Sequence, residues 1–145
     1  MTEFRRIDEH MLASPQIDVS DIAAAQLAGV TLIVNNRPED EAPDQTPGAE
    51  IEAAARAAGI DYVAVPVTHA GFSQHQVDAM VHALASADGS VLAYCRSGTR
   101  STLLWALARA KAGDNPSVIA SKAAQAGYDV SPVRQLLDML AAGQG

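Results

Sequence analysis

The stretch that decides the fold is VLAYCRSGTRS, residues 91–101, in which an apolar run stops at the single cysteine of the chain. Small residues and a glycine follow the cysteine, and a helix-forming segment comes next. This order predicts a strand, an anion-binding loop and a helix N-terminus. Small side chains leave the backbone N–H groups of Cys95–Arg100 free to turn inward around a tetrahedral anion. We therefore expect this loop to hold a small anion.

Cys95 stands where negative charge on a sulfur atom is stabilised. A helix beginning near Ser101 would point its unpaired amides and the positive end of its dipole at the thiol. Cysteines placed in this way ionise more readily than free cysteine, so we expect Cys95 to be a thiolate at neutral pH. The guanidinium fork of Arg100 can grip two oxygens of a phosphate or sulfate-like group. The plainer alternative is a buried, inert cysteine that ends a core strand.

The composition limits the function classes. The chain has 145 residues, which fits a single domain over 1–145. Its net charge of -7 makes nucleic acids and anionic membrane surfaces unfavourable partners, so an anionic substrate needs a local cationic site. No run reaches the roughly 18 apolar residues of a membrane span, and no apolar signal segment begins the chain. We expect a cytoplasmic protein with a small anionic or phosphorylated substrate.

A metal or cofactor is not indicated. One cysteine excludes an internal disulfide and a cysteine-based zinc site. His75 and His82 lie seven positions apart without a third ligand at metal-binding spacing, so we expect both to be solvated. The expected cofactor and metal content is therefore none. No pattern indicates an oligomeric state.

Apolar runs separated by glycine and proline predict alternating strands and helices. The expected strands are a short edge strand at 4–7, buried strands at 30–34 and 62–67, and the strand 90–94 before Cys95. Helices are expected at 22–28, 49–58 and 73–87, and three more close the chain after residue 101. This alternation predicts an α/β fold, a three-layer sandwich with a mostly parallel central sheet. We expect the run 30–34 at the centre of that sheet.

Two further loops follow expected strands, and in an open parallel sheet the carboxyl ends of the strands are where ligands bind. The loop 35–47 is acidic and carries Arg37, which could supply a second cation, although most surface arginines are merely solvated. The loop 68–72 contains His69 as its single ionisable side chain. We expect both loops to approach Cys95.

Three segments together resemble the dual-specificity, cysteine-dependent phosphatases, and more narrowly the bacterial phosphatase-like domain of beta-lactamase-hydrolase-like proteins. They are LIVNNRP (32–38) followed by acidic residues, YVAVPV (62–67) and CRSGTRS (95–101), and the resemblance covers about residues 8–112. It implies the dual-specificity-phosphatase fold. It also implies that Cys95 forms a phosphocysteine, that Arg100 binds phosphate, and that Ser101 helps the thiolate to leave. The remaining loop residues would bind the substrate: Arg96, Ser97, Gly98 and Thr99.

The sequence departs from that family in two ways. Phosphatases of this type usually place five residues between cysteine and arginine and a histidine before the cysteine, whereas here four intervene and Tyr94 precedes. They usually also carry an aspartic acid that protonates the leaving group, and the loop 68–72 has no carboxylate. His69 could be that acid, an anion donor or a bystander. Glu39 or Asp40 could replace it.

Three functions remain open. The first is hydrolysis of a phosphate monoester through Cys95, which the longer segment match favours. The second is sulfur transfer through a Cys95 persulfide, because the loop also resembles that of the rhodaneses and this chemistry needs no acid for an alkoxide. The third is a non-catalytic domain that binds an anion or a partner.

Overall fold

The strand that precedes Cys95, β5 (Ser90–Tyr94), forms the middle of a five-stranded sheet in the computed structural model, which describes residues 2–143. The strand order is β1-β2-β5-β3-β4. Here β1 is Arg5–Arg6, β2 is Met11–Ser14, β3 is Val30–Asn35 and β4 is Asp61–Ala64. All neighbouring strands run parallel except β1, which pairs antiparallel with β2. The predicted α/β class and mostly parallel sheet are confirmed.

Three details of the predicted sheet were wrong. The run 30–34 is an interior strand, but the centre is β5 and not β3. The segment 62–67 was expected to be a buried strand, yet β4 ends at Ala64, lies at the sheet edge and is largely exposed. The buried residues of this segment are Val65 and Val67, which follow the end of the strand. The strand β2 was not predicted.

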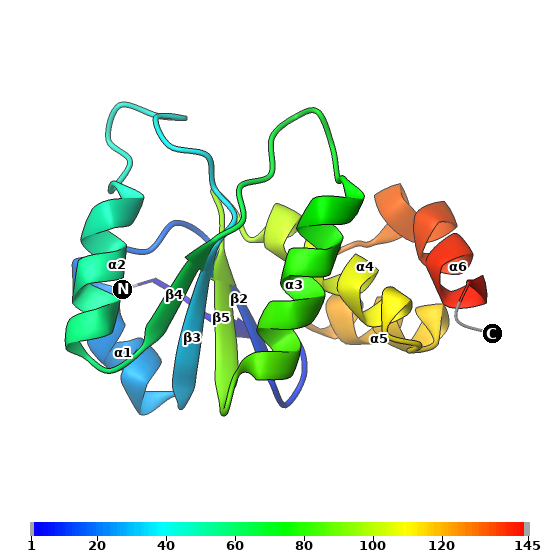
Figure 1. Cartoon of the computed structure of the whole chain (residues 1–145), viewed down its shortest axis with the longest axis horizontal. Helices are drawn as coiled ribbons and strands as arrows, with labels where there is room; N and C mark the ends of the chain where they lie inside the picture. Colours follow the sequence, from blue (N-terminus) through cyan, green and yellow to red (C-terminus); the bar gives the residue numbers. More distant parts are fainter. Residues whose placement is uncertain (1, 144–145) are drawn as a thin grey trace.

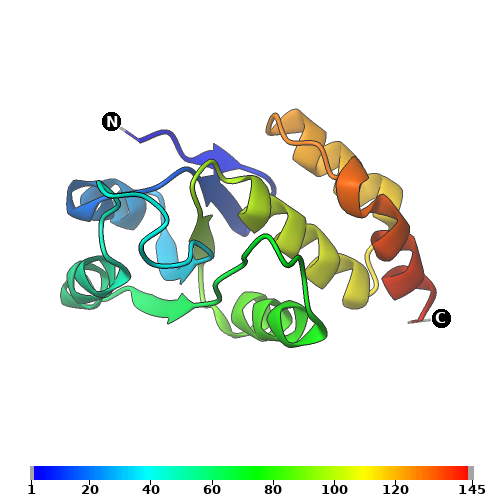
Figure 2. The ribbon, with the colours of Figure 1, turned by 90° about the horizontal axis from the view of Figure 1, so that it is seen from above.

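Six α-helices surround the sheet within the described residues. They are α1 (Ile22–Leu27), α2 (Gly48–Ala57), α3 (Gln74–Ser86), α4 (Thr99–Lys111), α5 (Pro116–Gln125) and α6 (Arg134–Ala142). Figures 1 and 2 show α1 and α2 on one face of the sheet and α3 and α4 on the other, with α5 and α6 packed outside α4. The predicted three-layer sandwich therefore carries an additional outer layer. No helix within residues 2–143 is both long and apolar enough to span a bilayer.

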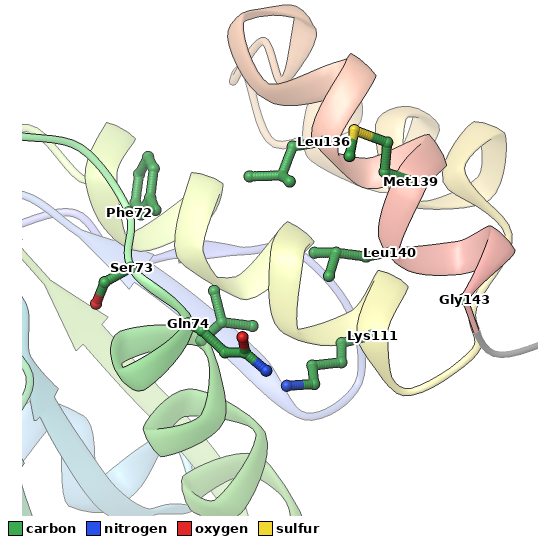
Figure 3. Close-up of a pocket in the computed structure, with 9 residues that line it drawn as sticks. Phe72, Ser73, Gln74, Lys111, Leu136, Met139, Leu140 and Gly143 are labelled. Atoms are coloured by element: carbon green, nitrogen blue, oxygen red, sulfur yellow. The ribbon is translucent and has the colours of Figure 1, made fainter.

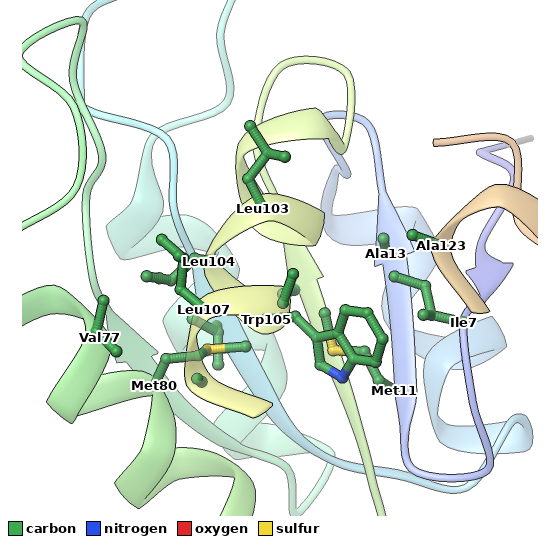
Figure 4. Close-up of a cluster of buried hydrophobic side chains, with 14 of the residues drawn as sticks. Ile7, Met11, Ala13, Val77, Met80, Leu103, Leu104, Trp105, Leu107 and Ala123 are labelled. Atoms are coloured by element: carbon green, nitrogen blue, oxygen red, sulfur yellow. The ribbon is translucent and has the colours of Figure 1, made fainter. Parts of the chain in front are cut away.

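Successive side chains of β5 point to opposite faces of the sheet, so the strand contributes to a hydrophobic cluster on each face. Val91 and Ala93 pack toward α3 and α4, and Leu92 and Tyr94 pack toward α1 and α2. On the first face, Trp105 of α4 is buried among Ile7, Met11 and Ala123, as Figure 4 shows. A strand buried on both faces is held firmly, so its carboxyl end gives Cys95 a rigid support.

Candidate active site at the carboxyl ends of the strands

The connection between β5 and α4 is shorter than the sequence predicted. β5 ends at Tyr94 and α4 begins at Thr99, two residues before the expected start near Ser101. Gly98 precedes the helix in the left-handed region, with φ 93°, a conformation that L residues with a side chain rarely adopt. Arg100 therefore lies in the first turn of α4 and not in a loop, and its direction is fixed by the helix.

Cys95 is completely buried, and its sulfur accepts a hydrogen bond from the loop that follows it. The backbone N–H of Gly98 donates to Cys95 Sγ at 3.1 Å. The backbone N–H of Cys95 donates to the carbonyl of Ser14 at 3.3 Å, and the N–H of Gln16 donates to the carbonyl of Arg96 at 3.3 Å. The carboxyl end of β2 therefore holds the loop in place, and a peptide donor accompanies the sulfur.

Arg100 is bound on one edge of its guanidinium group. Nη1 and Nη2 each donate to a carboxylate oxygen of Glu41 at 2.8 Å, and Nη1 also donates to the carbonyl of Val67 at 2.8 Å. This bidentate pair is the main cause of the raised pKa of Arg100, and the nearby Cys95 sulfur also raises it. The Arg100 guanidinium is therefore held in a fixed position close to the Cys95 sulfur.

Glu41 forms ion pairs with both Arg37 and Arg100, a role that no sequence pattern predicts. Its Oε1 also accepts a hydrogen bond from Nε of Arg37 at 3.0 Å. Arg37 is 5% exposed, and its Nη1 donates to Gln16 Oε1 at 3.0 Å. Arg37 is therefore a buried, hydrogen-bonded residue and not a solvated surface arginine. The pKa of Glu41 is lowered to about 2, and the hydrogen bond from Arg100 is the main cause. Glu41 is therefore ionised at neutral pH.

The other predicted residues are distributed unevenly. His69 is exposed, as are Arg96, Ser97 and Thr99. Ser101 is buried, and its hydroxyl has no hydrogen-bond partner among the described residues. The expected donation from Ser101 to sulfur is thus absent from this conformation.

The two carboxylates considered as substitute acids lie elsewhere. Glu39 accepts a hydrogen bond from the N–H of Gly48 at 2.9 Å, at the start of α2. Asp40 is exposed in a left-handed turn with φ 62°. Of the carboxylates on the loop 35–47, Glu41 is the one recorded in contact with Arg100.

The pKa of Glu41 predicts a pH dependence of stability. Because this pKa is depressed, the ion pairs stabilise the fold fully above about pH 4.5 and lose that effect as the pH falls toward 2. The Glu41 side chain is 21% exposed, so we expect the contribution to be about 1 kcal/mol. Urea unfolding at about pH 6 and about pH 3 measures it, with the Glu41→Gln variant as the comparison.

We expect the stability difference between wild type and Glu41→Gln to shrink at the lower pH. The matched control is Glu52→Gln, which removes an exposed ion pair with Arg56 on α2. Its difference from wild type should be small at both pH values. An equal difference for Glu41→Gln at both pH values would contradict the assigned ion pair.

A separate apolar cavity of about 280 Å³ lies between α3 and α6 (Figure 3). Its walls come from Phe72, Val77, Leu136 and Leu140, with Lys111 at one side. None of the predicted site residues lines it. The cavity is therefore distinct from the Cys95 site.

Known sequences resemble this chain over most of its length. Residues 3–112 match the family model described as "Beta-lactamase hydrolase-like protein, phosphatase-like domain". A beta-lactamase hydrolase-like protein of Xylella fastidiosa (strain Temecula1 / ATCC 700964) is 39% identical over 102 residues, which is 70% of this chain and 23% of the relative. One from Agrobacterium fabrum is 33% identical over 108 residues, 74% of this chain and 25% of the relative. The chain spans about a quarter of the length of these curated relatives.

Solved structures share the fold over nearly the whole chain. A protein from Neisseria meningitidis Z2491 with a provisional phosphatase name has a TM-score of 0.81 and 34% identity, covering 94% of this chain and 96% of that one. TpbA from Pseudomonas aeruginosa in complex with phosphotyrosine has a TM-score of 0.67 and 17% identity, covering 97% of this chain and 88% of that one. At that identity the likeness concerns the fold alone.

Proposed function

The chain belongs to the family of the phosphatase-like domain of beta-lactamase hydrolase-like proteins, and from this membership we propose that it is an enzyme that uses Cys95 as a nucleophile toward a small anionic substrate. The Gly98 amide donates a hydrogen bond to Cys95 Sγ, and the Arg100 guanidinium lies near the same sulfur. A peptide donor and a cation beside the sulfur are features of nucleophilic cysteines. Arg100 would bind the substrate anion through the edge of its fork that Glu41 leaves free. Glu41 and Val67 act as positioning groups for Arg100.

We propose that the group transferred is a sulfane sulfur atom. The observation that carries this choice is the state of Glu41, because the carboxylate that contacts Arg100 is ionised and held by two arginines. A basic alkoxide needs a proton from a general acid, whose help is typically worth about 10²–10⁴-fold. Glu41 cannot give that proton at neutral pH. Sulfur transfer needs no such proton when its leaving group is weakly basic.

With thiosulfate as the donor, the steps balance as follows. The Cys95 thiolate attacks the outer sulfur, the sulfur–sulfur bond of thiosulfate breaks, and sulfite leaves with the electron pair. Cys95 then carries a persulfide, whose negative charge takes the place of the thiolate beside the Gly98 amide. Cyanide attacks the terminal sulfur, thiocyanate leaves, and the thiolate is restored. Arg100 stabilises the anionic donor and the leaving sulfite.

A second candidate is hydrolysis of a phosphate monoester. Its support is the fold, which is shared at a TM-score of 0.81 with a relative that carries a phosphatase name. In that reaction the Cys95 thiolate attacks phosphorus, the ester oxygen leaves, and water hydrolyses the phosphocysteine. His69, exposed on the loop 68–72, would have to supply the proton. Fold alone does not decide chemistry, so we rank this candidate second.

The domain assignment and location belong to the same proposal. We propose one domain over 1–145, which the two hydrophobic clusters on opposite faces of one sheet support. We also propose a cytoplasmic location, because a lone nucleophilic cysteine needs a reducing compartment to stay free.

The test compares two substrate classes on one preparation. The protein is incubated with thiosulfate and cyanide, and separately with p-nitrophenyl phosphate and phenyl phosphate, whose leaving groups differ in basicity. We expect thiocyanate formation, and a mass gain of one sulfur atom on the protein when thiosulfate is given alone. Both signals should be absent in Cys95→Ser. We expect slow hydrolysis of p-nitrophenyl phosphate and at least about 10²-fold slower hydrolysis of phenyl phosphate.

Two results would overturn the choice of sulfur. Efficient release of phosphate from phenyl phosphate without thiocyanate formation would establish the second candidate and require an acid such as His69. Absence of every product would instead indicate a domain that binds an anion or a partner without catalysis. Thiocyanate formation that persists in Cys95→Ser would exclude Cys95 as the nucleophile.

A further inference from the structure

The peptide unit between Ser97 and Gly98 has a hydrogen-bond partner on each side. Its N–H, which belongs to Gly98, donates to Cys95 Sγ at 3.1 Å. Its carbonyl, which belongs to Ser97, accepts a hydrogen bond from the Tyr128 hydroxyl at 3.3 Å. A trans peptide is planar and points its N–H and its C=O in opposite directions. Tyr128 therefore bonds the far side of the same unit that contacts the sulfur.

The orientation of this peptide decides whether the sulfur faces a donor or an acceptor. Rotating the Ser97–Gly98 peptide about its neighbouring bonds would change φ of Gly98, which is now 93°. Glycine readily adopts both positive and negative φ, so both orientations of the peptide are accessible. In the rotated state the Ser97 carbonyl oxygen would point toward Cys95 and would repel a thiolate. The hydroxyl of Tyr128 bonds the carbonyl in one of the two states and so favours the state that directs N–H at Sγ.

Tyr128 is itself fixed by the surrounding chain. It follows Gly127 at the end of α5, and its own N–H donates to the carbonyl of Ala123 at 2.9 Å. The guanidinium of Arg5 lies 5.4 Å from the centre of the Tyr128 ring and also donates to the carbonyl of Ala126 at 3.2 Å. Burial is the main cause that raises the pKa of Tyr128, so the hydroxyl keeps its proton and remains a donor.

We propose that Tyr128 is a positioning residue of the Cys95 site, which holds the Ser97–Gly98 peptide in the orientation that stabilises the thiolate. The proposal rests on the proposed role of Cys95 as the nucleophile. Tyr128 lies outside residues 3–112, the part of the chain that matches the family model. The segment between α5 and α6 therefore belongs to the site as well as to the outer layer.

The test uses Tyr128→Phe, which keeps the ring beneath Arg5 and removes the hydroxyl alone. The readout is the thiolate ultraviolet absorbance followed through a pH titration, taken at each pH as the difference from the same protein with Cys95→Ser. One lost hydrogen bond is worth about 1 kcal/mol, so we expect an about fivefold lower ratio of thiolate to thiol. The kcat for thiocyanate formation should fall by a similar factor with little change in KM.

The matched control is Arg134→Gln, on the same C-terminal segment, which loses bonds to Asp138 and Ser117 but none to the loop. Its absorbance and kcat should equal those of wild type. An unchanged thiolate absorbance in Tyr128→Phe would overturn the proposal. Because the absorbance needs no substrate, it separates this proposal from the reaction: a reduced absorbance without any turnover in wild type would overturn only the proposed function.

Reduced stability alone would not account for the expected signal. If Tyr128→Phe unfolds at a lower temperature, the amide proton of Gly98 in the nitrogen-15 NMR spectrum gives a second measurement. In wild type its chemical shift should change when Cys95→Ser is introduced. In Tyr128→Phe this change should become smaller, and a change of full size would overturn the proposal.

Discussion

Replacing Arg100 by alanine is expected to lower kcat/KM for thiosulfate by about 10²–10³-fold, the typical cost of removing one preorganised donor from a site where charge develops. The Glu41 carboxylate and the Val67 carbonyl hold the guanidinium in place before any substrate binds. The reaction therefore needs no free energy to orient this group. The thiolate absorbance should fall together with activity, because the variant also removes a positive charge close to Cys95.

Arg100→Lys should recover little of this loss. A lysine ammonium cannot donate in parallel to both oxygens of Glu41 and still present a second donor edge to an anion. The matched control is Arg56→Ala, which removes an exposed arginine from a similar ion pair with Glu52 on α2. It should keep full activity. Wild-type kinetics in Arg100→Ala would mean that the anion is bound elsewhere, with Arg37 as the nearest alternative.

Gly98→Ala is expected to destabilise the protein by about 2–5 kcal/mol and to remove most of the activity. Two costs add here. A residue with a Cβ is strained by about 1–2 kcal/mol at φ 93°. The new Cβ would also collide with the Tyr128 hydroxyl, and overpacking typically costs about 1–3 kcal/mol. Any relief of this collision moves the peptide that donates to Cys95, so stability and activity should fall together.

Gly71→Ala separates the two costs. Gly71 has φ 96°, almost the same backbone conformation, but a Cβ built there has no other atom within 4 Å. Urea unfolding of this variant should show the strain alone, about 1–2 kcal/mol, and its activity should be retained. If Gly98→Ala and Gly71→Ala were equally stable and equally active, the contact between Gly98 and Tyr128 would be excluded.

The parts of the fold that the sequence could predict are those whose pattern is local. The strand 90–94 has the predicted bounds, and the helix expected at 73–87 is α3, which begins at Gln74 and is capped by Ser73. The strand β2 escaped prediction because four residues with methionine, alanine and serine carry little strand propensity, and its pairing with β5 supplies the order. The position of β4 at the edge of the sheet depends on which strands pair with each other. The spacing of apolar residues along the sequence does not contain that information.

The candidate site divides in the same way. Cys95, Gly98 and Arg100 are close in the chain, and the residue types alone predicted that they lie together. Glu41 lies in an acidic loop with Glu39, Asp40 and Asp44, and the sequence cannot tell which carboxylate turns toward an arginine 59 positions away. Tyr128 is separated from Ser97 by 31 positions and follows no motif. Contacts of this kind depend on how segments far apart in the chain pack together, which a local pattern does not describe.

The parallel direction of β2, β3, β4 and β5 gathers the reactive groups at one edge of the sheet, as Figure 1 shows for the loops above the strands. The opposite edge is consequently available for engineering. The turn at Gly59, between α2 and β4, is exposed, and no other atom approaches a Cβ built there. A peptide handle inserted at this turn would attach the protein to a sensor surface with the end of the sheet that carries Cys95 directed into the solution.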